Sequence, residues 1–226
     1  MKIEHLQIRT RQLERQLEFY REVLQQEVTR TTAESFTVKM GYTTLECVAD
    51  RSATPYHIAF RIGAHLERSA LKWLKDRVAI LPDGDQEVVD FQSWNAKSIY
   101  FHDADQNVLE LISRGHLHPT EAAEFDGTLM GIAEIGLATT EVEAIFRRLN
   151  KTLGLEKFTG NYHTFCATGD DQGLLIIINY TRKDWFPIDQ PAHPSAFKLR
   201  ISTATGQTSA IIYDGEELEV KQIKQS

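Results

Sequence analysis

Apolar and polar residues alternate along the chain in a pattern that predicts a repeated unit of strands and one helix. Residues Lys2–Arg9 alternate with period two, which places Leu6 and Ile8 on one face and His5 on the other. Residues 11–25 then carry leucines at helical spacing. Three strand-like runs complete the unit, at Glu27–Thr31, Ser35–Met40 and Tyr42–Val48. The predicted order is β-α-β-β-β.

The same order returns after a break at Asp50–Pro55. The second copy is expected to contain a strand at Tyr56–Ile62, a helix at Ala64–Val78, and strands at Glu87–Gln92, Ser98–His102 and Val108–Ser113. Both copies place a histidine on the first strand, His5 or His57. Both also place a glutamate on the last strand, Glu46 or Glu110. The two copies can therefore be compared position by position.

The second half of the chain repeats the pattern in a weaker form. After a linker at 116–128, a third unit begins at Leu129, and its helix is expected over 140–153. A fourth unit begins at Ala196 and has no helix of its own. We therefore expect a first domain at 1–115 and a degenerate, truncated second domain at 129–226.

Glu110 indicates where a functional site lies. It shares one strand face with Val108 and Ile112, and a carboxylate among apolar side chains needs a partner. If the first two units pack side by side, they form a cupped mixed sheet in an α+β protein, and their first and last strands line the cup. Four side chains would then converge there: His5, Glu46, His57 and Glu110. Two imidazoles and two carboxylates suit a divalent first-row metal ion.

Composition excludes several other classes of function. The chain has 226 residues, 42% of them hydrophobic, and a net charge of −7, which disfavours nucleic-acid and membrane surfaces. It contains no apolar run long enough to span a membrane and no signal-peptide pattern at its start. Two cysteines are too few for a disulfide framework, so we expect a cytoplasmic protein.

Residues 1–115 resemble the vicinal oxygen chelate superfamily, which contains glyoxalases, bleomycin-resistance proteins and extradiol dioxygenases. The resemblance is carried by His5-Leu-Gln-Ile with Phe19-Tyr20-Arg-Glu-Val-Leu24, by Tyr56-His57-Ile-Ala-Phe60, and by Tyr100-Phe-His-Asp-Ala-Asp-Gln-Asn-Val-Leu-Glu110-Leu. It implies paired β-α-β-β-β modules, a divalent metal ion (Ni, Zn, Fe, Mn or Co) and a small substrate that chelates the metal through adjacent oxygens. Ala104 and Gln106 depart from the family's usual Pro and Gly in the hairpin turn.

The reaction depends on whether Glu46 is a ligand. With Glu46 and Glu110 both bound, the site resembles glyoxalase I, in which one glutamate shuttles a proton through an enediolate. With only His5, His57 and Glu110 bound, it resembles the ferrous site of extradiol dioxygenases. The set of four slightly favours the lyase or isomerase branch. A third alternative is a protein of the bleomycin-resistance type that sequesters a small molecule without turnover.

Strand parity adds candidates around the metal. Gln7, Arg9 and Arg61 share a face with the histidines and are candidates for binding substrate, as is Ser98. The arginines are equally compatible with structural salt bridges. Tyr100 is a candidate catalytic donor beside Glu46 and Glu110, because a phenol can hydrogen-bond an oxyanion.

The second half matches the repeat without the ligand set. Glu134 and Ala196 stand at the histidine positions, and apolar residues 176–178 stand at the first glutamate position. The loop Thr181–Pro194 is interpreted as either a lid or a dimer contact. A small-molecule substrate and a homodimer are thus the expected partners.

Overall fold

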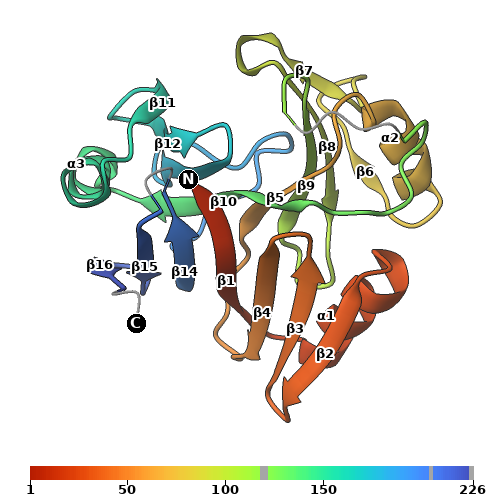
Figure 1. Ribbon diagram of the computed structural model, residues 1–226, viewed down its shortest axis with the longest axis horizontal. Helices are drawn as coiled ribbons and strands as arrows, with labels where there is room; N and C mark the ends of the chain where they lie inside the picture. Colours follow the sequence, from red (N-terminus) through yellow and green to blue (C-terminus); the bar gives the residue numbers. More distant parts are fainter. Residues whose placement is uncertain (118–121, 204–205, 224–226) are drawn as a thin grey trace.

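The strands of the protein form two mixed sheets with helices packed against them (Figure 1). The computed structural model describes residues 1–117, 122–203 and 206–223, so residues 118–121 of the expected linker lie outside the described part. The predicted α+β class and the repeated unit are confirmed. No helix in the described ranges is long and apolar enough to cross a membrane.

The first two units match their predicted order closely. The first unit contains β1 (Lys2–Thr10), α1 (Leu13–Glu18) continued by a π-helical turn (Phe19–Val23), β2 (Glu27–Thr32), β3 (Ser35–Met40) and β4 (Thr43–Ala49). The second contains β5 (His57–Arg61), α2 (Glu67–Lys75), β6 (Ile80–Leu81), β7 (Val89–Phe91), a 3-10 turn (Gln92–Trp94), β8 (Ala96–His102) and β9 (Val108–Arg114). The helix α2 is shorter at both ends than the periodicity predicts.

The third and fourth units follow the same plan. The third contains β10 (Gly131–Thr139), α3 (Val142–Leu153), β11 (Lys157–Gly160), β12 (Phe165–Asp170) and β13 (Gly173–Asn179). The fourth contains β14 (Phe197–Ser202), β15 (Thr208–Tyr213) and β16 (Leu218–Gln222). In the described residues it has no helix, as expected.

The units pair differently from the expectation. One sheet has the order β16-β15-β14-β1-β4-β3-β2 and joins the first and fourth units. The other has the order β11-β12-β13-β10-β5-β9-β8-β6, with β7 also on β8, and joins the second and third units. Leu6 on β1 is opposite Leu199 on β14, and Ile58 on β5 is opposite Ile135 on β10.

This pairing separates the first two units. The expected sheet built from residues 1–115 alone is not formed, and the sheets cross the expected boundary between 1–115 and 129–226. The physical reason is that alternation determines which face of a strand is buried but not which strand lies beside it. The first strand of each unit pairs with the first strand of another unit. Pairing the first unit with the second, or the first with the fourth, would bury the same strand faces.

One large apolar cluster connects the two sheets. The cluster contains residues of all four units, including Leu6, Ile58, Ile135 and Leu199. Thr43 also links the two sheets, because its hydroxyl donates to the carbonyl of Ile3 and accepts from the amide of Ile132. In Figure 1, β1 and β10 accordingly cross near the N-terminus. All residues of β9 are buried, so its inward-facing side chains are shielded from bulk water.

Candidate metal centre

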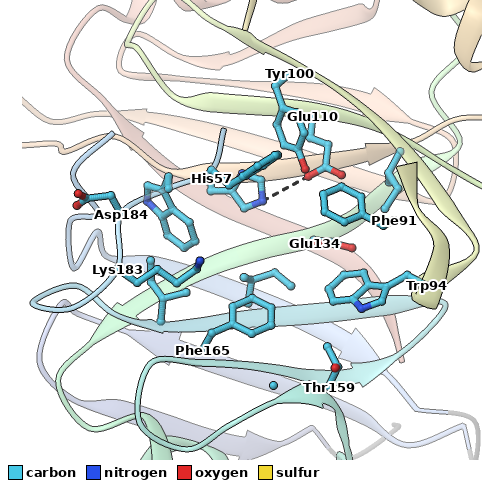
Figure 2. Close-up of a pocket in the computed structure, with 16 residues that line it drawn as sticks. His57, Phe91, Trp94, Tyr100, Glu110, Glu134, Thr159, Phe165, Lys183 and Asp184 are labelled. Atoms are coloured by element: carbon cyan, nitrogen blue, oxygen red, sulfur yellow. Dashed lines mark ion pairs between the residues drawn. The ribbon is translucent and has the colours of Figure 1, made fainter. Parts of the chain in front are cut away.

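A cavity of about 410 Å³ lies against one face of the second sheet (Figure 2). It is lined by residues from strands β5 and β7 to β13, from the 3-10 turn after β7, and from the loop that follows β13. Most of the lining is aromatic or aliphatic. Three of its ionisable side chains, those of His57, Glu110 and Glu134, come from strands of this sheet.

These three side chains come from three adjacent strands. Residues alternate in direction along a strand, so β5 presents His57, β9 presents Glu110 and β10 presents Glu134 on the same face. One donor atom of each lies within 4.8 Å of the other two. His57 Nε2 is 3.5 Å from a carboxylate oxygen of Glu110, marked by the dashed line in Figure 2.

The remaining polar atom of each residue is held by the protein. His57 Nδ1 lies 3.3 Å from the carbonyl oxygen of Val108, which can only accept a hydrogen bond. The hydroxyl of Ser98 donates to Oε1 of Glu110. Arg114 Nη2 donates to Oε1 of Glu134 over 3.0 Å. His57 Nε2 and one oxygen of each carboxylate are therefore left facing the same point.

Burial sets the charge of the imidazole. It lowers the pKa of His57 to about 4, so the ring is neutral near neutral pH. Because Nδ1 faces a carbonyl acceptor, the proton of the neutral ring lies on Nδ1 and the lone pair on Nε2. This is the tautomer that a metal-binding histidine requires.

The two carboxyl groups are both destabilised as anions. Burial raises the pKa of Glu110, and the neighbouring charge of Glu134 raises it further. Burial also raises the pKa of Glu134, while Arg114 and Arg61 act in the opposite direction. A divalent cation between the carboxylates would remove both penalties.

The donor set therefore fits a divalent metal ion. One imidazole nitrogen and two carboxylate oxygens suit Mn, Fe, Co, Ni or Zn, and each donor is oriented by an outer hydrogen bond, as metal ligands usually are. In the described part of the chain, no other group of three or more His, Cys, Asp or Glu donors lies this close together.

The predicted four-residue site is not assembled. His5 and Glu46 lie on β1 and β4, in the other sheet, where His5 Nε2 is 3.3 Å from Glu46 Oε2. Gln7 donates to the same carboxylate over 2.9 Å. The four residues thus form two separate pairs, because their units do not pack together. On β14, Arg200 is opposite His5 and a lysine is opposite Gln7, so cations occupy the facing strand of this sheet.

Four further predicted residues are divided between the two sheets. Ser98 donates a hydrogen bond to Glu110, while Tyr100, the register partner of Glu110 on β8, lines the cavity. Arg9 instead pairs with an aspartate on the first sheet, 2.9 Å away. Arg61 is buried and donates to backbone carbonyls of the turn between β12 and β13. Arg9 thus makes the structural salt bridge that was its alternative role, whereas Arg61 makes structural hydrogen bonds to the backbone.

Glu134 is the residue that the sequence reasoning left out of the site. In the third unit, Glu134 stands where the first two units have a histidine. From the sequence alone, this replacement indicates that the third unit has lost its metal ligands. The signal was present in that alignment of units. Glu134 can be recognised as a candidate ligand only when the second and third units are known to share a sheet.

The loop Thr181–Pro194 forms one wall of the cavity. Trp185 is buried and packs on His57, with ring centroids 5.1 Å apart. A hydrogen-bonded bridge joins Trp185 to Gln190, whose side chain contacts His102 and the carbonyl of Gln106. The loop is thus part of the cavity wall, and its role as a lid or as a dimer contact stays a prediction.

Comparison with known proteins supports the fold. No family model and no curated protein sequence matches the chain. A solved structure from Bacillus subtilis subsp. subtilis str. 168, provisionally named a dioxygenase, is 13% identical, with a TM-score of 0.63 over 98% of this chain and 84% of the other. Glyoxalase I from Zea mays is 14% identical, with a TM-score of 0.58 over 98% of this chain and 92% of the other. The chain has the glyoxalase/dioxygenase fold over almost its whole length.

Proposed function

We propose that this chain is a metal-dependent enzyme that acts on a small molecule chelating the metal through two adjacent oxygens. The observation that carries the proposal is the convergence of His57, Glu110 and Glu134, each held by a second hydrogen bond. A metal ion bound there would polarise the substrate oxygens as a Lewis acid. The solved relatives named glyoxalase I and dioxygenase support the same class of chemistry.

Glu110 is the residue best suited to move a proton. Burial raises its pKa when no cation is bound, so Glu110 can take up a proton whenever its carboxylate leaves the ion, as a general acid or base must. Tyr100 keeps its own proton, because burial raises the pKa of its phenol, and its hydroxyl can donate to developing negative charge. These two roles favour lyase or isomerase chemistry of the glyoxalase type.

Ring cleavage by a dioxygenase is the second candidate. Three protein donors rather than four leave more coordination positions open on a divalent ion. Against it, the set contains one histidine and two carboxylates instead of the two-histidine set expected from the sequence. Oxygen consumption with ortho-dihydroxylated aromatics would select this branch, and turnover of a thiol–oxoaldehyde adduct without oxygen uptake would select the first.

Metal binding is the primary test. We expect the purified protein to bind about one equivalent of Mn²⁺ or Zn²⁺, and we expect His57→Ala and Glu134→Gln to weaken binding by at least about tenfold. His5→Ala is the matched control, because His5 also lies beside a glutamate but in the other sheet. Binding that is lost in His5→Ala and kept in His57→Ala would overturn the proposed site.

A further inference from the structure

Seven rings form a continuous belt around the cavity. Neighbouring ring centroids along the belt are 5.1 to 6.5 Å apart. The members, in order, are Trp185, His57, Tyr100, Phe186, Phe91, Trp94 and Phe165. In Figure 2 the labelled rings surround the open centre, with Tyr100 and His57 on one side and Trp94 and Phe165 on the other.

Separate parts of the chain build this belt. His57, Phe91, Trp94 and Tyr100 come from the second unit, and Phe165 comes from β12 in the third. The loop after β13 supplies the remaining two rings together with Lys183, whose ammonium lies 5.9 Å from the centroid of the Phe165 ring. Each of these side chains lines the same cavity. The rings therefore belong to the wall of a single binding space, in addition to packing on one another.

The three donors of the metal centre lie together on the part of the wall that β5, β9 and β10 form. The strands also contribute the aliphatic side chains of Ile112, Ile176 and Ile178. Thr159, Lys183 and Asp184 add polar groups to the lining away from Glu110 (Figure 2). A ligand that reaches the metal centre must therefore direct its oxygen atoms at that part of the wall and place its body against the rings. A volume of about 410 Å³ is at the lower end of the range for small-molecule sites, enough for a body of about two fused rings.

We propose that the ligand of this cavity has a planar aromatic body with its oxygen atoms at the end that faces Glu110 and Glu134. Aromatic side chains bind another ring through edge and offset-stacked contacts that a saturated body of the same shape does not make. The orientation of the ligand rests on the proposed metal function, whereas binding of the ring does not. Aromatic cages also bind quaternary ammonium groups, and the lining contains carboxylates as well as Lys183. A cation is therefore the alternative ligand that the test must separate.

Equilibrium binding of three matched probes to the full-length protein tests this proposal, in EDTA and again with Mn²⁺. The probes are 2-naphthol, its saturated counterpart decahydro-2-naphthol, and benzyltrimethylammonium. We expect 2-naphthol to bind about tenfold or more tightly than decahydro-2-naphthol in EDTA, since several ring contacts each contribute roughly two- to tenfold. Replacing 2-naphthol by 2,3-dihydroxynaphthalene is expected to strengthen binding only when Mn²⁺ is present.

Variants separate the belt from general stability. Phe165→Leu and Trp94→Leu should each weaken 2-naphthol binding by about two- to tenfold and change decahydro-2-naphthol binding by less. Tyr162→Leu is the control, because Tyr162 packs on Phe146 and is not a cavity residue. Phe165 is only partly buried, so its variant is expected to fold.

The outcomes distinguish this inference from the proposed function. Equal binding of the aromatic and saturated probes, preference for benzyltrimethylammonium, or no binding of any probe would overturn the aromatic ligand. Ring binding without any bound Mn²⁺ would leave it intact and count against the metal-dependent function. Bound Mn²⁺ without a preference for the aromatic probe would support the metal-dependent function and count against the aromatic ligand.

Discussion

Glu110 and Glu134 flank the same residue from the two sides of β5. Ala59 is the register partner of Glu110 on β9 and of Glu134 on β10. Its side chain is a single methyl group, fully buried between the two carboxylates. The small residue leaves space above β5 in which the two carboxylates and His57 can approach one atom.

A larger side chain at this position should occupy that space. We expect Ala59→Leu to weaken Mn²⁺ binding by at least about tenfold, as calorimetric titration can measure, because misplaced ligands lose that much affinity. Overpacking is expected to lower the free energy of unfolding by about 1–3 kcal/mol. Ala210→Leu on β15 of the other sheet is the control and should leave Mn²⁺ binding unchanged. Unaltered affinity in Ala59→Leu would show that the ion lies elsewhere.

Metal affinity should rise with pH. Burial raises the pKa of Glu110 and of Glu134, so protons compete with the metal for both carboxylates, and the competition fades as pH rises. The imidazole does not compete in this range, because the pKa of His57 is lowered to about 4. An affinity for Zn²⁺ or Mn²⁺ that is independent of pH between about 6 and 8 would contradict carboxylate ligands of this kind.

The same shifts predict how stability depends on pH without metal. A carboxyl group whose folded pKa is raised holds its proton in the folded state after the unfolded chain has ionised. The free energy of unfolding contributed by Glu110 and Glu134 therefore falls as pH rises from their ordinary range through the raised values. We expect Mn²⁺ to increase Tm more at about pH 8 than at about pH 6, and Glu134→Gln to reduce that difference.

The sequence predicts local structure well here, and the partner of each unit poorly. Alternation places His57 and Glu110 on inward-facing sides of β5 and β9, and both reach the cavity. The same reasoning places His5 correctly on its strand face, yet β1 pairs with β14 instead of lying near β5. Strand faces depend on neighbours two residues away, whereas pairing depends on surfaces far apart in the chain. Glu134 was not predicted as a ligand because its place in the site depends on the pairing of β10 with β5, which the sequence pattern does not determine.

Arg114 should be needed for stability as well as for the position of Glu134. Its buried guanidinium pairs with Glu134 at 3.0 Å and with Asp171 at 3.2 Å. Arg114→Met leaves the buried carboxylate without its cation, and we expect a loss of about 3–5 kcal/mol in denaturant unfolding. Arg147→Met is the control, because Arg147 pairs with Glu143 on the exposed surface of α3 and should change stability by less than about 1 kcal/mol.

A double variant separates the ion pair from the packing of the long side chain. If the loss reflects an unpaired Glu134, Arg114→Met combined with Glu134→Gln should cost less than the sum of the two single changes. Strict additivity would assign the loss to packing of the guanidinium against Trp94, whose ring centroid is 5.5 Å away.

Gly136 on β10 determines how closely the loop after β13 can approach the cavity. A Cβ atom built on Gly136 would lie 2.5 Å from the indole of Trp185, too close for both to remain in place. We expect Gly136→Ala to displace Trp185 from His57 and to increase quenching of its fluorescence by acrylamide. The same change in a Trp185→Phe background should leave quenching of Trp73 and Trp94 unaltered. Quenching that stays constant in the single variant would show that the strand moves instead of the loop, which would assign the loop a fixed position in the wall.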